Sequence, residues 1–339
     1  MSKKNPTINE IARLAGVSKK SISRVINGEQ GVSEDTRSRI KQIMEEEGYA
    51  PNRRARALAN SRSFLLGLVY NNANSSYVLE LLAGCQATGN AQGYEIVMHS
   101  ISDDGNAAEE IIRFMRRSGC DGLILTPPAS ESTSIVAALL EQQWPMVRIA
   151  GDNADFQLSQ IKYNDRTASL SLASELIRLG HRQIAFIGGP NQAGPTLRRL
   201  AGVHDALALQ GLTLDHQSIR YGDFTFESGR EIAMELLTQS NRPTALICAN
   251  DEMAAGAYQS AATLGIAIPT ELSVSGFDDS PAASHLWPQL TSVRQPVQEM
   301  AADAVHQLIN FASQDSNFLI KQYEAEIVFR NSIAPPPEG

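Results

Sequence analysis

The chain has 339 residues, of which 42% are apolar, and a formal net charge of −8. This length predicts two or three domains. The sequence contains neither a run of about 18 apolar residues nor the apolar stretch of a secretory signal. We therefore expect a cytoplasmic protein without a membrane partner. Residues 1–62 contain 13 lysine and arginine residues and 7 aspartate and glutamate residues, which gives this segment a net charge of +6 and the remainder −14. This asymmetry points to a polyanion partner for the basic segment alone.

The basic segment begins with three predicted helices between residues 7 and 48. Thr7 and Glu10 stand at capping-box spacing, and Gly16 ends this first helix. Ser18 caps a second helix, whose outer face carries Lys19, Lys20, Ser23 and Arg24. Two short helices joined by a glycine-containing turn are typical of a helix-turn-helix, whose second helix can enter the major groove. A three-helix bundle with a solvated basic face would show the same pattern.

Residues 51–61 predict a helix that needs a partner. Pro51 keeps the residue before it out of the helical conformation, Asn52 can cap the amides that follow, and good helix formers come next. A helix this short is marginal on its own in water. We therefore expect its apolar side, with Ala55 and Leu58, to pack against a surface outside this segment.

These motifs, in this order, resemble the head of the lactose/galactose repressor family. The match includes Thr-Ile-Asn-Glu-Ile-Ala-Arg-Leu-Ala-Gly-Val-Ser from residue 7 and Glu-Gly-Tyr-Ala-Pro-Asn-Arg-Arg-Ala from residue 47. The resemblance implies that residues 1–50 bind double-stranded, pseudo-palindromic operator DNA, with base edges read from the second helix. It also implies that residues 51–61 form a hinge helix that wedges Leu58 into the minor groove. The DNA-binding residues are then Thr7, Ser18, Lys19, Lys20, Ser21, Ser23, Arg24, Asn27, Asn52, Ala55, Arg56 and Leu58.

From residue 62 onward, short apolar runs alternate with helical stretches in two successive series. The predicted strands are 65–70, 95–99, 122–126 and 146–149, then 184–188, 245–249 and 273–276. Such alternation predicts parallel sheets covered on both faces. The fold class is therefore α/β, with a small all-α helix-turn-helix head and two doubly wound lobes.

Polar side chains follow several of the predicted strands. They lie in the segments 71–77, 189–191, 250–251 and 278–279. Ligands of doubly wound sheets bind beyond the carboxyl ends of the strands. Hydrogen-bonding groups together with the aromatic rings of Tyr77, Phe224 and Phe226 suit a sugar or another polyhydroxylated molecule.

The body also resembles the sensor domain of the same family, a pair of lobes similar to periplasmic binding proteins with an effector in the cleft. The match includes Leu-Gly-His-Arg-Gln-Ile-Ala-Phe-Ile-Gly-Gly from residue 179 and Leu-Ser-Val-Ser-Gly-Phe-Asp-Asp from residue 272. It implies a body of residues 62–339, with lobe 1 at about 62–162 and 293–320 and lobe 2 at about 163–292 and 321–339. With Tyr77 included, the expected effector-binding residues are Tyr77, Arg148, Arg199, Phe224, Asn250 and Asp278.

Three of these residues have a simpler alternative role. Asn250 could serve only as the cap of the helix that follows it, Asp278 could make a turn, and Arg199 could be a surface charge.

His181 shows no metal-ligand spacing, so a turn or surface role is expected. The end of the chain, Pro-Pro-Pro-Glu-Gly, predicts a disordered tail.

The predicted function is a sequence-specific transcriptional regulator, a repressor controlled by a small-molecule effector, which we expect to be a sugar. A purine-like metabolite, or an effector acting as corepressor, stays open, and a solute-binding protein is a remote alternative. No nucleophile elbow, paired metal-binding histidines or complete phosphate-binding loop is found, so we expect neither an enzyme nor a cofactor or metal. The chain lacks a C-terminal leucine heptad, so a homodimer is expected.

Overall fold

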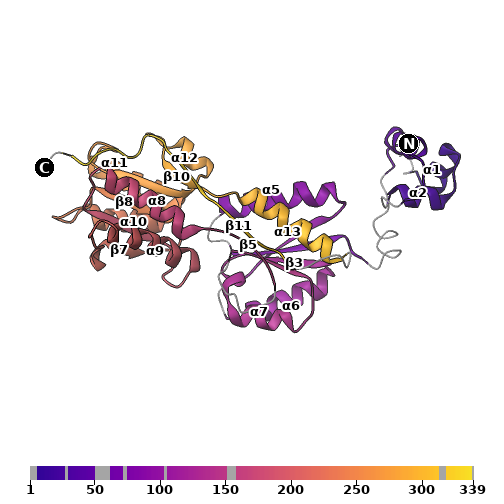
Figure 1. The fold of residues 1–339 in the computed structure, drawn as a ribbon, viewed down its shortest axis with the longest axis horizontal. Coiled ribbons are helices and arrows are strands. Elements are labelled where there is room, and N and C mark those ends of the chain that lie inside the picture. The colour runs from indigo at the N-terminus through magenta and orange to yellow at the C-terminus, as the bar shows by residue number, and fades with distance from the viewer. Residues whose placement is uncertain are drawn as a thin grey trace. The chain divides into compact units, whose positions relative to one another are not determined.

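The computed structural model describes residues 6–26, 30–49, 62–71, 75–102, 105–150, 158–312 and 318–337. Contacts divide the chain into two compact units, Met1–Phe64 and Leu65–Gly339, here the head and the body (Figure 1). The hinge segment 51–61 and the predicted DNA-binding residues Asn27, Asn52, Ala55, Arg56 and Leu58 lie outside the described residues.

The head contains three helices in its described part, α1 (Ile8–Ala15), α2 (Lys19–Ile26) and α3 (Glu34–Glu46). The capping box at α1 is present: the Thr7 amide donates to Glu10 Oε2 at 2.6 Å, and the Glu10 amide donates to Thr7 Oγ1 at 3.4 Å. Gly16 ends α1 with a φ of 63°, a conformation that costs glycine nothing. The helices meet around a small apolar core in which Ile11, Ile22 and Ile40 are fully buried.

The body is built from two sheets, which define its lobes. Lobe 1 has the strand order β11-β5-β4-β3-β1-β2, and lobe 2 has the order β12-β10-β9-β8-β6-β7. All the described pairings are parallel except that of β12 with β10. The strands of lobe 1 are β1 (Leu65–Tyr70), β2 (Glu95–Ser100), β3 (Gly122–Leu125), β4 (Met146–Ile149), β5 (Ser159–Tyr163) and β11 (Ile320–Tyr323). Those of lobe 2 are β6 (Ile184–Gly188), β7 (Ile219–Tyr221), β8 (Ala245–Cys248), β9 (Ser273–Asp278), β10 (Thr291–Arg294) and β12 (Glu326–Val328).

Helices cover the sheets. In lobe 1, α5 (Ser75–Ala91) packs with α13 (Val297–Ala312) on one side of the sheet, and α6 (Ala107–Ser118) lies with α7 (Thr133–Leu140) on the other (Figure 1). In lobe 2, α8 (Asp165–Arg178) packs with α9 (Gly194–Ala208), and α10 (Phe226–Leu237) packs with α11 (Asp251–Leu264). The shorter helices are η1 (Ala129–Glu131), η2 (His216–Ser218) and α12 (Pro281–His285). Every residue of the central strands β3, β6 and β8 is buried, as expected for strands covered on both faces.

The chain passes between the lobes three times. The crossings run from β5 to α8, from β10 to α13, and from β11 to β12. The carboxyl ends of strands from both sheets therefore border the region between the crossings, as the doubly wound architecture requires. Within the described ranges, no helix is both long and apolar enough to span a bilayer.

The prediction of a turn or surface role for His181 was wrong, and the predicted disordered tail, residues 335–339, is described only up to residue 337. His181 is buried, with Nδ1 at 2.8 Å from Thr244 Oγ1 and Nε2 at 2.8 Å from the carbonyl oxygen of Ala334. The Ala334 amide donates to Ser273 Oγ at 3.0 Å. These bonds hold Ala334, the residue just before the predicted tail, against lobe 2. Pro336, within the tail, lies close to Gly180.

We expect the free energy of unfolding to decrease as the pH falls below about 6.5. Burial lowers the pKa of His181 in the folded protein, although its bond with Ala334 acts in the opposite direction. The unfolded chain therefore binds more protons than the folded chain between about pH 6.5 and the lower folded pKa, and stability is lost across that interval. Urea unfolding at a series of pH values should give a shallower acid-side slope for His181→Gln than for the wild type. Equal slopes would contradict this role.

Candidate functional site

The outer face of α2 is an exposed basic surface of the head. Lys19 and Lys20 are exposed, and Ser23 and Arg24 are half-buried. The Ser21 amide donates to Ser18 Oγ at 3.1 Å, so the expected cap of α2 is present. This arrangement leaves the amino groups of both lysines in solvent at the start of a helix, where a polyanion can reach them.

A second candidate site surrounds Arg199, on the second turn of α9. Its side chain is 4% exposed. Nε donates to Asp165 Oδ1 at 2.8 Å, Nη2 donates to Tyr163 Oη at 2.7 Å, and Nη1 donates to the carbonyl oxygen of Ala249. The guanidinium carbon lies 3.7 Å from the centroid of the Phe277 ring. The alternative of a surface charge is therefore excluded.

The Arg199 guanidinium keeps its charge despite its burial. Burial alone would lower the pKa of Arg199, but Tyr163, Asp165 and Asp278 raise it above its ordinary value. Asp165 also accepts a hydrogen bond from Arg198 Nε at 2.9 Å. One buried carboxylate is thus shared by two adjacent arginines.

Asn250 has the capping role that the sequence left open, and a second contact besides. Its Oδ1 accepts the amide of Met253 at 2.9 Å, which caps α11, and its Nδ2 donates to the carbonyl oxygen of Phe224 at 2.8 Å. Phe224 has a φ of 67°, uncommon for a bulky residue. A Cβ at Gly189 would overlap the Phe224 ring, so the ring lies directly against this backbone. Asn250 and Gly189 together fix the position of the Phe224 ring.

Asp278, at the end of β9, has a strained backbone and a largely buried carboxylate. Its φ is 113°, its exposure is 9%, and Oδ1 accepts a hydrogen bond from Gln295 Nε2 at 2.5 Å. Burial and the nearby Asp278 raise the pKa of Asp251 above its usual range, which favours the neutral form of Asp251. Strain at an irregular turn of this kind is typical of functional sites.

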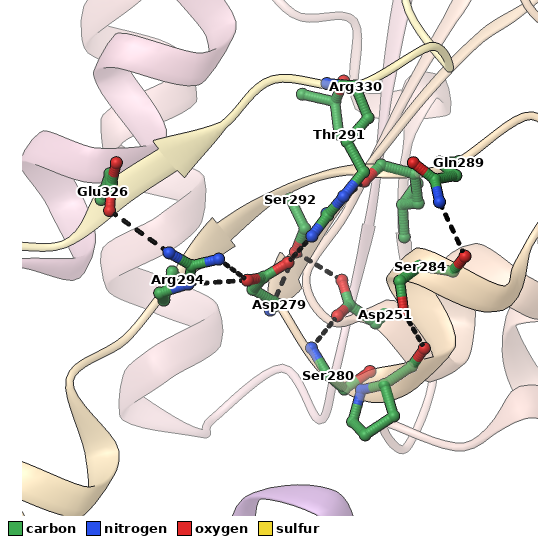
Figure 2. Close-up of polar contacts among 12 residues, drawn as sticks. Asp251, Asp279, Ser280, Ser284, Gln289, Thr291, Ser292, Arg294, Glu326 and Arg330 are labelled. Atoms are coloured by element: carbon green, nitrogen blue, oxygen red, sulfur yellow. Dashed lines mark hydrogen bonds and ion pairs between the residues drawn. The ribbon is translucent and has the colours of Figure 1, made fainter.

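The residues after Asp278 connect the ends of several strands (Figure 2). Asp279 accepts hydrogen bonds from Arg294 Nε at 2.7 Å and from Arg330 Nη2 at 2.6 Å. Asp251 accepts the Ser280 amide at 2.7 Å and the Ser292 hydroxyl at 2.6 Å. A cavity of about 460 Å³ lies beside this network and is lined in part by Asp278, Asp279, Arg294 and Gln295.

The structure places the two remaining predicted residues in lobe 1. Tyr77 is a half-buried residue of α5, and burial raises its pKa, with the charges of Asp278 and Asp165 acting in the same direction. Arg148 is 1% exposed, and its Nη1 donates to the carbonyl oxygen of Ser130 at 3.3 Å. Burial lowers the pKa of Arg148, while the neighbouring Glu131 raises it.

Sequence reasoning missed three residues of this site, Tyr163, Asp165 and Glu131. Tyr163 ends β5, and Asp165 begins the helix after it, so the rule that polar side chains follow strands would have found both if β5 had been predicted. Glu131 is held at the site by contacts with lobe 2 residues, which no local pattern reveals. Among the residues that the structure describes, no group of three or more His, Cys, Asp or Glu side chains could hold a metal ion.

Two family models match the chain. One, for bacterial regulatory proteins of the lacI family, matches residues 7–52, and the other, for a periplasmic binding protein-like domain, matches residues 173–333. The HTH-type transcriptional regulator AscG of Escherichia coli (strain K12) is 31% identical over 335 residues, which cover 97% of this chain and 99% of AscG. The chain belongs to the LacI family. The resemblance noted in the sequence and the predicted fold class are both confirmed.

Solved structures of LacI-family proteins match nearly the whole chain. The lac repressor dimer bound to operator and the anti-inducer ONPF matches with a TM-score of 0.77 and 26% identity, covering 98% of this chain and all of that one. The complex of the transcriptional regulator CelR with cellobiose matches with a TM-score of 0.74 and 28% identity, covering 97% of this chain and all of that one. These LacI-family relatives are transcriptional regulators and not enzymes.

Proposed function

We propose that the chain is a homodimeric transcriptional repressor whose affinity for operator DNA is controlled by a sugar bound between the two lobes. The buried polar cluster around Arg199 carries this proposal. It combines charged and amide groups with the rings of Phe224, Phe277 and Tyr77, and this mixture suits hydroxyl groups and the apolar faces of a sugar ring. The sugar complex of CelR, a family relative, supports the same ligand class.

In the proposed mechanism, the sugar changes the relative populations of two lobe arrangements. It can do so only if it binds one arrangement more tightly than the other. Residues 51–61 connect the lobes to the head in the sequence. A change in the lobe arrangement could therefore reach the head and change operator affinity. The structure of the lac repressor dimer bound to operator supports a dimer that binds DNA. The two heads of such a dimer would each meet one half-site.

The test begins with a thermal-shift screen of monosaccharides and disaccharides on the full-length protein. A DNA site selected from a random pool then serves as operator, and its affinity is measured with and without each sugar that raises the melting temperature. A sugar that binds and changes operator affinity would support the proposal. Stabilisation by sugars without any change in operator affinity would contradict it.

We expect Lys19→Ala and Lys20→Ala to relax the sequence preference of the protein. Residues at the start of the second helix of a helix-turn-helix contact base edges, and loss of one such contact costs about 1–3 kcal/mol on the preferred site. Affinities for the selected site and for single-base variants of it, measured at several salt concentrations, would show the change. Lys41→Ala, an exposed lysine on α3, is the matched control. A uniform loss on all sites with a smaller salt dependence would instead identify phosphate contacts.

A further inference from the structure

Glu131 connects the two lobes through both oxygens of its carboxylate. It belongs to η1, which follows β3 of lobe 1, and its partners are on α9 of lobe 2. Oε1 lies 2.8 Å from Arg198 Nη1, and Oε2 accepts the amide of Gly194 at 3.1 Å. The side chains of Arg198 and Glu131 are 19% and 14% exposed, so the pair is largely shielded from solvent.

The Glu131 carboxylate occupies an anion-binding site at the start of α9. The first amides of a helix have no partner within the helix and carry partial positive charge, so they favour a carboxylate or phosphate. Beside the Gly194 amide, the Arg198 guanidinium contributes a full positive charge to this site. A Cβ at position 194 would collide with the carboxylate, so only glycine lets Glu131 come this close.

Glu131 also completes the charge balance of the candidate site. The guanidinium groups are those of Arg148, Arg198 and Arg199, and the facing carboxylates are those of Glu131, Asp165 and Asp278. Asp251 adds little further negative charge, because burial and Asp278 favour its neutral form. Positive and negative groups are therefore equal in number within this set, and a bound molecule with a net charge would upset that balance at partly buried positions.

We propose that Glu131 is a specificity-determining residue, whose carboxylate fills the anion site formed by Gly194 and Arg198, so that the cleft accepts uncharged sugars and rejects sugar acids and sugar phosphates. This inference rests on the proposed function for the identity of the ligand. An anionic sugar would either face the like charge of Glu131 or have to displace it from Arg198 and Gly194. Both outcomes weaken binding of the anion relative to its neutral counterpart.

The first experiment asks whether the site holds an anion, and it needs no sugar. Full-length Glu131→Ala is melted in increasing concentrations of sodium formate, with sodium chloride at equal ionic strength as the reference. Formate should raise the melting temperature of Glu131→Ala in a saturable way, because it replaces the missing carboxylate. It should leave the wild type and Glu141→Gln, which changes an exposed glutamate of lobe 1, at their chloride values. Equal responses of the three proteins would overturn the proposal.

The second experiment compares neutral and acidic sugars on wild type and Glu131→Gln, which keeps the size of the side chain. The matched probes are galactose with galacturonate, and glucose with glucuronate and glucose 6-phosphate. Removing one like charge at close range should raise the affinity for at least one acidic probe about tenfold or more. Affinity for the neutral probe should change less than about threefold, because Glu131 acts on charge and not on hydroxyl groups.

The outcomes separate this inference from the function on which it rests. Wild-type protein that binds an acidic probe as tightly as its neutral counterpart would overturn the role of Glu131. Failure of Glu131→Gln to gain affinity for any acidic probe, in a protein that binds sugars, would do the same. If no sugar binds either protein, the sugar effector is wrong, and the formate experiment alone decides whether Glu131 fills an anion site.

Discussion

Arg199→Ala is expected to destabilise the body by about 3 kcal/mol, near the lower limit for removing one partner of a buried ion pair. The lower limit applies because Arg198 still neutralises Asp165. The substitution also leaves Tyr163 Oη and the Ala249 carbonyl oxygen without their donor and removes the group that covers the Phe277 ring. Under the proposed function, the variant loses its response to the sugar.

Denaturant unfolding followed by tryptophan fluorescence would measure this loss. Both tryptophans of the chain, Trp144 and Trp287, belong to the body, so the signal reports its unfolding and not that of the head. Arg166→Ala is the matched control on the neighbouring helix α8, because its ion pair with Asp205 is exposed and should contribute little. Similar midpoints for wild type and Arg199→Ala would show that the buried pair does not stabilise the body.

Deletion of residues 1–61 is expected to reduce operator affinity more than about 1,000-fold, because the basic face of α2 is then absent and the remaining chain is acidic. The body forms a compact unit by itself, so the shortened protein should unfold with the same midpoint as the full-length chain. It should also keep its affinity for any sugar that the full-length protein binds.

Electrophoretic mobility shifts on the selected site, at low and at physiological salt, would measure the loss of DNA binding. Tryptophan fluorescence on the same samples is the control for folding. Retained, site-specific binding by residues 62–339 would mean that the body contacts DNA and that the head is not the reading surface.

The accuracy of the sequence-based prediction differed between apolar and polar strands. β1, β4 and β6 begin and end where predicted, because each is a short apolar run buried on both faces. β5, β7 and β11 were not predicted as strands. They read Ser-Gln-Ile-Lys-Tyr, Ile-Arg-Tyr and Ile-Lys-Gln-Tyr, and their extended conformation depends on pairing with a neighbouring strand more than on their own composition.

The candidate site was predictable where one residue both ends a strand and carries a polar group. Asp278 ends β9, Asn250 follows the end of β8 by two residues, and Arg199 was reached only through the family resemblance. Asp165 was missed because β5 was not predicted, and Glu131 could not be placed because its role depends on which lobes come together. The double role of Asn250, as cap of α11 and as donor to the Phe224 carbonyl oxygen, likewise needs the tertiary structure.

Two of the three chain crossings are joined where they meet lobe 2. β10 and β12 pair antiparallel there, with Arg294 opposite Glu326, and Asp279 accepts a hydrogen bond from Arg294. Arg294 Nη1 also lies 3.6 Å from Glu326 Oε2, at the start of β12. These two crossings should therefore bend as one mechanical element when the lobes rotate relative to each other.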